Sequence, residues 1–425
     1  MLASRRTIPV YFVIALFLLS IYYLWHREPQ QFHLALLNRR SQLWQRLHPL
    51  LEEYAPGCPP PVLKGSPGTR RFDANSETPR MNYISNVDEV ELPMQTMHDG
   101  FVQAIRNVQL DPVYIPGTTG IVSSAGGTYL PTFLVTILLL RRTGSPLPVE
   151  LFMKDRTEYE AVIYCAPLHD PAVILGSEPF KSAGMVTWPD FWANTAAPAY
   201  FNISRQPEPL STARQATEAG ILLISKPTHF LALVLAAYYN YYGPDYYYTL
   251  LDQGAPGAGD KDTFLHAATA LNETFYAVSE SVIDVGNVTP WNSHVAINAG
   301  YIQADPIQDF NLTSQGKWRV KDASVAKPPR AFFIHAGDPE FNPGKDLLGR
   351  KLKGFDGKPT RLWTYPPEAM RRLGYDAEKA FWEQTMFLAC DLRPAFETWR
   401  SKERLCEDVE AHWRAVFEDP AMEAP

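Results

Sequence analysis

The sequence lacks a basic stripe, and this absence excludes one large class of partner. Its 425 residues carry a formal net charge of −7, and the 39 lysines and arginines are dispersed along the chain. Nucleic-acid binding depends on clustered cations that contact phosphates, so we discard nucleic acid as a partner. Internal repeats and low-complexity tracts are absent too. With 46% hydrophobic and 20% charged residues, the chain suits one large globular domain with appendages.

Long apolar runs near the chain ends are scarce, and the only one lies at residues 8–24. It is close to the roughly 20 residues that cross a bilayer. No small-residue cleavage site follows it, and Tyr22, Tyr23 and Trp25 resemble an interfacial aromatic belt. The sequence therefore predicts a cytosolic tail over residues 1–7 and an uncleaved transmembrane signal anchor over 8–24. The short span fits the thinner membranes of the early secretory pathway.

Glycosylation motifs indicate on which side of the membrane the remaining chain lies, because the arginines that flank the span are balanced. Four Asn-x-Ser/Thr motifs lie beyond the span, at Asn202, Asn272, Asn287 and Asn311. Four such motifs are more than chance would place in this part of the chain. We therefore predict a lumenal domain with glycosylation at these asparagines.

Cysteine is rare, with four residues in the whole chain. Cys390 and Cys406 can form a disulfide in an oxidising compartment, although spacing alone proves no pairing. The alternative is that they are buried free thiols. Cys58 and Cys165 remain unassigned.

The first part of the chain beyond the span has the composition of a stem. Residues 27–50 have apolar positions at helical spacing and can form an oligomer through this helix. Residues 55–80 are rich in Pro, Gly and Ser, which is typical of a spacer. We predict a stem over 25–110 and a lumenal domain over 111–425.

A β-α-β unit is predicted between Gly120 and Met153. An apolar run ends at Gly126 and Gly127, a helix with Pro131 in its first turn follows, and a second apolar run begins after a Pro-bounded turn. Ligands of such units bind at the carboxyl ends of the strands. Gly126 and Gly127 let a donor nucleotide approach the backbone there, and the alternative is a tight turn.

Aromatic residues surround an acid in the stretch from Gly184 to Tyr200. Trp188 and Trp192 offer flat apolar faces, and Asp190 offers a carboxylate that accepts hydrogen bonds from hydroxyls. The three residues are candidates for binding an acceptor sugar. The alternative is that these aromatics belong to the core. For the seven tyrosines between positions 238 and 248 we favour helix packing.

Asp-x-Asp occurs once in the chain, at Asp260 and Asp262. Paired carboxylates can hold Mn²⁺ or Mg²⁺ against a diphosphate, but such pairs follow an apolar strand, whereas this one follows a glycine-rich loop and opens a helix. Both acids are candidate catalytic residues, and the alternative for Asp260 is a helix cap. A glycosidase pair is disfavoured because residues two apart on a helix diverge.

His335 ends the apolar run of residues 331–335. A histidine at a strand end beside a phosphate crevice can complete a metal site or contact a diphosphate. The alternative is a structural histidine.

Taken in order, "RRTGSPLPVELF", "WPDFW", "AAYYNYYGPDYYYTLLDQGAPGAGDKDTF" and "FFIH" resemble the fungal Golgi α-mannosyltransferases of glycosyltransferase family 71. The resemblance implies a single-pass type II Golgi membrane protein. Its lumenal domain is expected to be α/β and GT-A-like, with a mixed, mostly parallel central sheet. The implied reaction transfers mannose from GDP-mannose, with Mn²⁺, to mannose residues of glycoprotein glycans.

The resemblance also indicates a missing segment. In the family, the piece that begins like "VELFMKDRTEYE" continues for several dozen residues, through an apolar strand and the Asp-x-Asp that binds the metal. Here Cys165-Ala166-Pro167 follows almost directly. A gene-model error, a splice form and a real loss would each produce this join. Without those acids, little holds the metal that neutralises the leaving group.

Two functions remain open at this point. The first is an α-mannosyltransferase that has lost the usual Asp-x-Asp metal ligands, and with them its activity if no other group replaces them. Gly126, Gly127 and His335 would lie at the donor, Asp260 and Asp262 near the reacting sugars, and His335 is the remaining metal candidate. The second is a non-catalytic Golgi subunit that binds glycans or assists assembly. A glycoside hydrolase ranks last.

Overall fold

The computed structural model describes residues 37–108, 110, 112–125, 127–152, 165–257, 259–289, 292–296, 299–337, 339–345, 347–349, 352–354 and 357–418. These residues fall into two compact units. One unit contains the residues up to Ala55 together with Asp99–Thr118, and the other contains Pro56–His98 together with the residues from Thr119 onward. The predicted tail and signal anchor lie outside the described residues.

The prediction of a single-pass Golgi membrane protein requires a correction. Within the described part of the chain, no helix is long and apolar enough to cross a membrane. This finding contradicts the predicted membrane topology, and we do not retain the Golgi membrane assignment. The prediction rested on one apolar run of borderline length, and apolar residues alone do not establish a span.

The smaller unit contains a helix over residues 37–53, where the sequence predicted one over 27–50. Tyr54 follows this helix and packs edge-on against Phe101, with 6.4 Å between the ring centroids. A Cβ atom at Gly100 would lie 2.4 Å from the Tyr54 ring, so only glycine fits at this contact. Oligomer formation through this helix stays a prediction.

Residues 56–98 belong to the larger unit, and the 25–110 stem stays a prediction. The Arg80 side chain is buried, donates to Asn194 Oδ1 at 2.8 Å and lies 4.9 Å from the centroid of the Phe201 ring. Arg71 forms an isolated antiparallel bridge with Trp192. A Pro- and Gly-rich stretch can thus be ordered when its polar side chains bond to a folded domain.

Eleven strands are described. They are β1 (Ile121–Ser124), β2 (Val149–Phe152), β3 (Cys165–Pro167), β4 (Met185–Ala193), β5 (Gln215–Ile224), β6 (Tyr276–Ala277), β7 (Ile283–Val285), β8 (Val288–Thr289), β9 (Asn292–Ala296), β10 (Gly300–Ala304) and β11 (Ala331–His335).

Helices connect and cover these strands. The α-helices are α2 (Val87–Asn107), α3 (Leu130–Arg142), α4 (Ala172–Leu175), α5 (Phe180–Ala183), α6 (Pro198–Ile203), α7 (Lys226–Tyr241), α8 (Tyr248–Asp252), α9 (Thr263–Leu271), α10 (Pro306–Thr313), α11 (Pro367–Leu373), α12 (Ala377–Asp391), α13 (Glu397–Arg400) and α14 (Leu405–Phe417). Short 3₁₀ or π turns are η1 (Gly127–Tyr129), η2 (Gly243–Tyr247), η3 (Ala323–Val325) and η5 (Arg393–Ala395).

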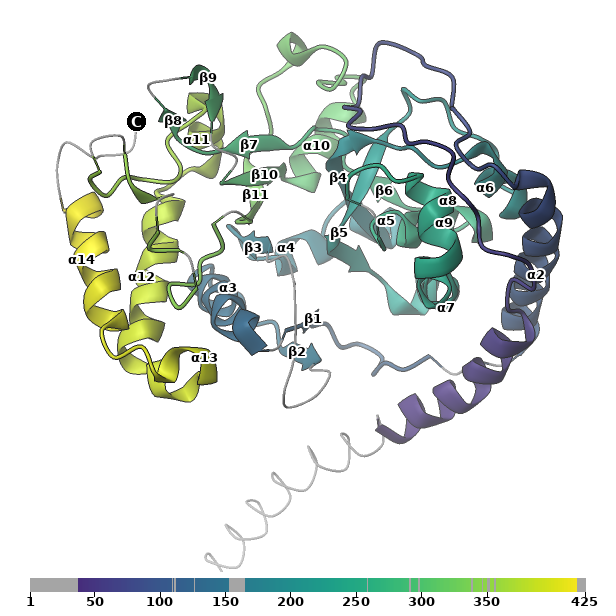
Figure 1. Ribbon diagram of the computed structural model, residues 1–425, viewed down its shortest axis with the longest axis horizontal. Coiled ribbons are helices and arrows are strands. Elements are labelled where there is room, and N and C mark those ends of the chain that lie inside the picture. The colour runs from purple at the N-terminus through teal and green to yellow at the C-terminus, as the bar shows by residue number, and fades with distance from the viewer. Residues whose placement is uncertain are drawn as a thin grey trace, which may run out of the picture. The chain divides into compact units, whose positions relative to one another are not determined.

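The predicted β-α-β unit is confirmed. Strands β1 and β2 pair in parallel, from Ile121 opposite Val149 to Ser124 opposite Phe152, and α3 is the crossover between them. Pro131 occupies the first turn of α3, where its missing N–H costs no hydrogen bond. These two strands form a sheet of their own, which Figure 1 shows apart from the other sheets.

The prediction of one mostly parallel central sheet is wrong. The described strands form separate sheets with the orders β1-β2, β3-β11-β10-β7, β5-β4-β6 and β8-β9. Among the described strands, only the pairs β1–β2 and β4–β6 are parallel, and every pair in the four-stranded sheet is antiparallel. The prediction extended the parallel arrangement of one β-α-β unit to the whole domain. Later in the chain, however, the connections place neighbouring strands side by side in opposite directions. The α/β class holds.

Three hydrophobic clusters are described in the larger unit, and the two largest join its sheets and helices. One joins the four-stranded sheet to α3, α11, α12 and α14, and its largest side chains are Trp363, Trp382 and Trp399. The other lies between the four-stranded and three-stranded sheets, where Trp188 packs edge-on against Phe333 at 5.2 Å. This second cluster fixes β10 and β11 against β4 and β5.

The tyrosine-rich run packs as predicted. Tyr238, Tyr239 and Tyr247 are fully buried, and their rings lie 4.7 to 6.3 Å apart by centroid. Burial raises the pKa of Tyr238, Tyr239 and Tyr247, so their phenols stay neutral. Tyr241 is an exception, with 48% of its surface exposed.

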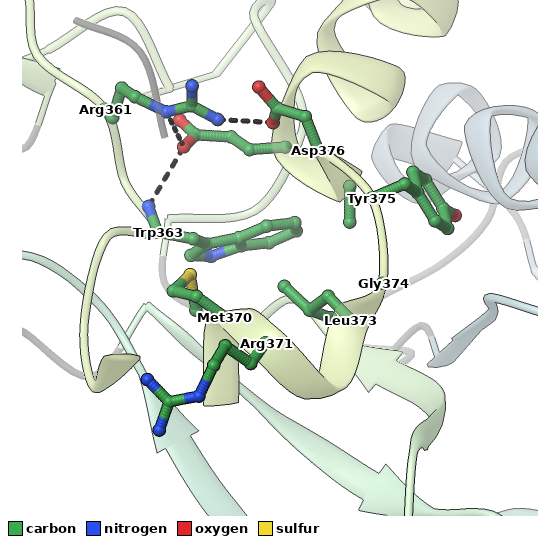
Figure 2. Close-up of a pocket in the computed structure, with 10 residues that line it drawn as sticks. Arg361, Trp363, Met370, Arg371, Leu373, Gly374, Tyr375 and Asp376 are labelled. Carbon is green, nitrogen blue, oxygen red and sulfur yellow. Dashed lines mark hydrogen bonds and ion pairs between the residues drawn. The ribbon is translucent and has the colours of Figure 1, made fainter. Parts of the chain in front are cut away.

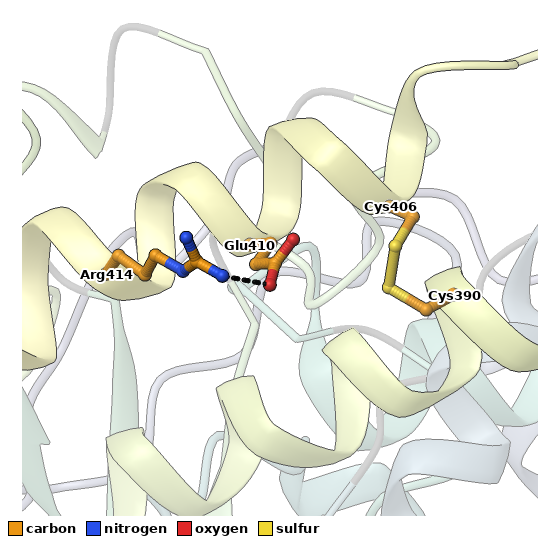
Figure 3. The surroundings of a disulfide bond; sticks show 4 residues. All are labelled: Cys390, Cys406, Glu410 and Arg414. Atoms are coloured by element: carbon orange, nitrogen blue, oxygen red, sulfur yellow. Dashed lines mark hydrogen bonds and ion pairs between the residues drawn. A yellow bond between two sulfur atoms is a disulfide. The ribbon is translucent and has the colours of Figure 1, made fainter.

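A disulfide joins Cys390, in the last turn of α12, to Cys406, in the first turn of α14 (Figure 3). The two helices also pack against each other along their length. The Glu410–Arg414 ion pair lies on α14 beyond the disulfide, with 2.6 Å between Arg414 Nη2 and Glu410 Oε1. Cys58 and Cys165 are not disulfide-bonded.

We expect the double variant Cys390→Ser, Cys406→Ser to lose about 2–3 kcal/mol of unfolding free energy. The bond closes a loop with a sequence separation of 16, and cross-linking such a loop removes entropy from the unfolded chain. Urea unfolding under oxidising conditions measures the loss, and Cys58→Ser is the control. Equal stability of the double variant and the native chain would show that the bond contributes nothing.

Candidate functional site

Glu218 and Tyr301 form the centre of the candidate site. Glu218 lies on β5 and Tyr301 on β10, and Tyr301 Oη donates to Glu218 Oε2 at 2.6 Å. The second carboxylate oxygen accepts from the backbone N–H of Gly220 at 2.7 Å. Burial, followed by the charge of Glu218, raises the pKa of Tyr301 far above its usual range. Tyr301 is therefore a permanent hydrogen-bond donor that holds the carboxylate in place.

His335 lies beside this pair, at the end of β11. Its ring is 4.2 Å from that of Tyr301 by centroid, and its Nδ1 is 3.2 Å from Cys165 Sγ and 4.0 Å from Glu218 Oε2. Burial lowers the pKa of His335 to about 3, so the ring is neutral. A neutral, 3%-exposed imidazole cannot supply positive charge to a diphosphate. Burial also raises the pKa of the Cys165 thiol.

Asp190 adds a second carboxylate, from the neighbouring strand β4. Its Oδ2 lies 3.2 Å from Lys261 Nζ, and its Oδ1 accepts from the backbone N–H of Phe191 at 2.6 Å. Burial raises the pKa of Asp190, and Lys261 opposes that rise. Lys261 also donates to the carbonyl of Pro256 at 3.0 Å, which fixes its ammonium group beside Asp190.

Asp260 is the third carboxylate and precedes Lys261 in the loop before α9. Its surface is exposed, yet desolvation by the surrounding loop raises its pKa, and the nearby charge of Glu218 adds to this rise. The predicted capping alternative is not what the structure has, because α9 begins at Thr263 without a side-chain cap. We refer to Asp190, Glu218 and Asp260 with Lys261, Tyr301 and His335 as the Glu218 cluster.

Asp262 does not join this cluster. It is 2% exposed, and its Oδ1 accepts from the backbone N–H of Thr217 at 3.0 Å and from the Thr217 hydroxyl at 3.1 Å. Its charge offsets part of the desolvation that lowers the pKa of Arg214 and of Arg80. The carboxylate therefore compensates buried cations, and residues two apart at the start of α9 diverge as helix geometry requires.

The predicted acceptor aromatics separate into core and surface. Trp188 is fully buried and donates from Nε1 to the carbonyl of Ala304 at 2.9 Å, so it is a core residue. Phe191 and Trp192 are half-buried, and the guanidinium carbon of Arg71 lies 5.7 and 5.9 Å from their ring centroids. Phe191 packs edge-on against Tyr301 at 4.8 Å. This aromatic surface therefore adjoins the Glu218 cluster.

Of the two predicted donor glycines, the structure describes Gly127, which belongs to the turn before α3. Gly126 lies outside the described residues. Gly127 has a φ of 50° and opens η1, so its backbone conformation alone explains glycine at this position. Figure 1 shows β1 and β2, which precede and follow this turn, apart from β4, β5 and β10. Donor binding at Gly126 and Gly127 stays a prediction.

The predicted glycosylation sites differ in access. Asn202, Asn272 and Asn311 are exposed. Asn287 is half-buried, and its Nδ2 donates to the carbonyl of Arg361 at 2.9 Å. Asn202 Nδ2 also donates, to Glu91 Oε1 at 3.2 Å, so it is partial burial that makes Asn287 the least accessible of the four.

The described residues do not form the site expected for Mn²⁺. They contain no group of three or more His, Cys, Asp and Glu side chains that could hold a metal ion. Asp262 is bonded to Thr217, and the metal candidate His335 contacts Cys165 through Nδ1. We derive no step through a metal.

Asp252 anchors the glycine-rich loop that carries Asp260 and Lys261. Its Oδ1 accepts from the backbone N–H of Gly254 at 2.6 Å, while its buried Oδ2 has no hydrogen-bond partner among the described residues. Burial raises the pKa of Asp252 to about 6, although Gly254 and Lys261 oppose the rise. The ionised carboxylate therefore lowers the stability of the folded protein at neutral pH.

We expect Asp252→Asn to stabilise the protein at pH 7.5 by on the order of 1–2 kcal/mol. Because the folded pKa lies above the unfolded one, the native carboxyl costs stability above pH 6, and this cost fades as the pH falls toward 4. Thermal unfolding of both proteins between pH 4 and 8 measures the difference, with the exposed Asp245→Asn as the control. A difference that does not depend on pH would contradict the assignment.

Sequence reasoning missed Glu218 and Tyr301. Neither belongs to a motif, and they lie 83 residues apart in the chain. The available signal was weak, because Glu218 follows Gln215 and Thr217 in the polar first half of residues 215–224 and only the second half is apolar.

Comparison with known proteins places this site in context. A family model described as "Mannosyltransferase putative" matches residues 210–308, a span that includes Glu218, Asp260, Lys261 and Tyr301. The α-1,2-mannosyltransferase MNN21 of Candida albicans is 26% identical over 91% of this chain and 79% of its own length. MNN24 of the same organism is 29% identical over 64% of this chain and 54% of its own length.

A further relative is the α-1,2-mannosyltransferase MNN5 of Saccharomyces cerevisiae, which is 26% identical over 48% of this chain. The chain spans about half the length of MNN24 and of MNN5. These findings confirm the resemblance to fungal α-mannosyltransferases. The alignment with MNN21 covers 528 positions, more than the 425 residues of this chain, so that relative carries residues with no counterpart here.

Proposed function

We propose that this protein transfers mannose from GDP-mannose to a mannose residue of a glycan. The observation that carries the proposal is the Glu218 cluster, which lies inside the span matched by the mannosyltransferase model. The relatives are named α-1,2-mannosyltransferases, which favours an α-1,2 linkage. The half-buried aromatic pair beside the cluster suits the C–H face of a sugar.

The chemistry follows from the charges of the cluster. In the transfer, the acceptor hydroxyl forms a bond to the anomeric carbon, the bond from that carbon to the diphosphate breaks, and GDP leaves with the electron pair. Positive charge develops on the sugar ring, and a fixed carboxylate such as Glu218 stabilises it. Tyr301 and the Gly220 N–H hold that carboxylate. The proton of the acceptor hydroxyl passes to a carboxylate, for which Asp260 is exposed.

Lys261 is the cation of the cluster. Its ammonium group is fixed by Asp190 and by the Pro256 carbonyl, on the loop that carries Asp260. Positive charge held in this way stabilises a leaving diphosphate. In this proposal, Lys261 supplies part of the positive charge that a metal ion would otherwise bring to the leaving diphosphate.

A second candidate is a glycan-binding protein without turnover. The residues of MNN21 that this chain lacks favour it, as does the absence of a metal-ligand group among the described residues. The two sheets on either side of residues 153–164 are separate, and β3 has β11 as its only described partner. Such an arrangement is expected if a strand of the relatives is missing at the predicted join.

The test is transfer by the purified full chain. We expect GDP-mannose and α-mannobiose to yield a trisaccharide, detected by mass spectrometry, and GDP-glucose to yield none. Binding of mannobiose without product would favour the glycan-binding protein. Release of mannose without any nucleotide sugar would favour a hydrolase. Sequencing the transcript across the codons for Tyr164 to Asp170 shows whether a longer form exists.

A further inference from the structure

The pocket of about 330 Å³ between α11 and α12 brings no set of side chains to bear on a ligand, as far as the described residues that line it show. In Figure 2 the Tyr375 ring and the Arg371 guanidinium point away from Trp363. Groups that do converge lie elsewhere, beside the Glu218 cluster and at the edge of the four-stranded sheet.

The polar residues of the Glu218 cluster continue to the edge strand of that sheet. His335 on β11 lies opposite Tyr301 on β10, and Tyr301 lies opposite Asp284 on β7. Residues directly opposite each other on neighbouring strands point to the same face of a sheet. Asp284 therefore lies on the face that carries His335 and Tyr301, one strand beyond the cluster.

Arg71 meets Asp284 from a distant part of the chain. Its Nη2 lies 3.7 Å from Asp284 Oδ2, and the side chains of Arg71 and Asp284 are 69% and 31% exposed. An exposed ion pair at this distance adds little to stability. The stability of the fold therefore does not account for the pair, and both side chains are accessible to a ligand.

Arg71 is nevertheless held in one place. Its backbone forms a bridge with that of Trp192, and the N–H of Ala193 donates to the carbonyl of Arg70 at 2.9 Å. Its guanidinium carbon lies 5.7 and 5.9 Å from the ring centroids of Phe191 and Trp192, where cation–π attraction orients it. Because its N–H groups already have a fixed direction, a ligand that binds them loses less conformational entropy.

The chemistry of the pair suits neighbouring hydroxyls of a sugar. A guanidinium only donates hydrogen bonds and a carboxylate only accepts them, whereas a hydroxyl does both. Two adjacent hydroxyls of a pyranose ring can therefore accept from Arg71 and donate to Asp284. A purine base is disfavoured because the guanidinium already covers the aromatic rings on which it would stack. A diphosphate is disfavoured because the Asp284 carboxylate repels it.

We propose that Arg71 and Asp284 bind the sugar unit of the acceptor glycan that is linked to the reacting mannose. The inference rests on the proposed function, in which the reacting sugars lie at the Glu218 cluster. Phe191 connects the two places, because it lies beside Arg71 and packs edge-on against Tyr301 at 4.8 Å. An acceptor of two or more mannose units contacts both the pair and the cluster, whereas a single mannose contacts the cluster alone. The pair therefore selects longer acceptors.

The experiment compares the binding of α-1,2-mannotriose and of methyl α-mannoside to the full chain in the absence of donor. Ligand-observed NMR titrations give both dissociation constants for the native protein, Arg71→Ala and Asp284→Asn. We expect each variant to bind mannotriose about tenfold more weakly and methyl mannoside as well as before, since a hydrogen bond to a charged group is lost only with the longer ligand. The matched control is Arg404→Ala, at an ion-paired arginine exposed to 78%, and it should change neither constant.

Three results would overturn the proposal. They are no binding of mannotriose by the native protein, equal affinities of the native protein and both variants, and a loss of GDP binding in Arg71→Ala while mannotriose binding is unchanged. Circular dichroism shows that each variant is folded. Turnover of GDP-mannose is measured separately. Turnover with equal affinities refutes this sugar site alone, whereas a selective loss of mannotriose binding in a protein without turnover refutes the enzyme alone.

Discussion

Replacing Asp262 by alanine is expected to lower the free energy of unfolding by about 3 kcal/mol. The carboxylate is 2% exposed and accepts two hydrogen bonds from Thr217. Its removal also takes away a negative charge that compensates the buried guanidinium groups of Arg214 and Arg80, although Arg80 keeps its ion pair with Glu208. Urea unfolding measures the loss.

Two variants separate the contributions at this position. Asp262→Asn keeps an oxygen that accepts from Thr217 but removes the charge, so it should lose less stability than Asp262→Ala. Asp245→Ala removes an exposed carboxylate and should change nothing measurable. An Asp262→Ala protein that is as stable as the native chain yet inactive would instead support the catalytic role that the sequence suggests.

Replacing Glu218 by glutamine is expected to lower the rate of mannose transfer about 100-fold or more. Glutamine has nearly the same shape, and its Oε1 can accept from the Gly220 N–H while its Nε2 donates to Tyr301 Oη, so the thermal midpoint should hardly change. What is lost is the negative charge that stabilises the developing positive charge of the sugar. Initial rates with GDP-mannose and mannobiose measure the effect.

The same initial rates are measured for the variants Tyr301→Phe and Glu397→Gln. Tyr301→Phe removes the hydroxyl that fixes Glu218, so we expect a smaller loss, of about tenfold. Glu397 is exposed on α13, and its replacement should leave the rate unchanged. A Glu218→Gln protein with the native rate would show that the reaction centre lies elsewhere.

The elements that local patterns specify were predictable. The β-α-β unit over Gly120–Met153 follows from apolar periodicity, Pro131 and the glycines that flank the helix, and the structure contains it. The tyrosine-rich helices were predicted to pack, and they do. Contacts between distant strands were not predictable in the same way. The parallel pairing of one unit was extended to a sheet whose pairs are antiparallel.

The candidate site was also predictable only in part. Asp190 and Asp260 were singled out from their neighbours in the sequence, and both lie in the Glu218 cluster. Trp188 and Asp262 were singled out on the same grounds, but their side chains point into the protein. Residue type shows what a side chain can do, but burial decides whether a substrate reaches it.

By itself, the sequence determined the α/β class, a net negative composition without a basic stripe, the packing of the tyrosines and the resemblance to fungal α-mannosyltransferases. Each depends on residues close together in the chain or on overall composition. Only the tertiary structure decided which acid meets which partner, because Glu218 and Tyr301 are 83 residues apart and meet through the order of two sheets. Trp188 and Phe333 pack against each other between the two sheets and fix their relative position. The 2.6 Å hydrogen bond between Tyr301 and Glu218 depends on that fixed position.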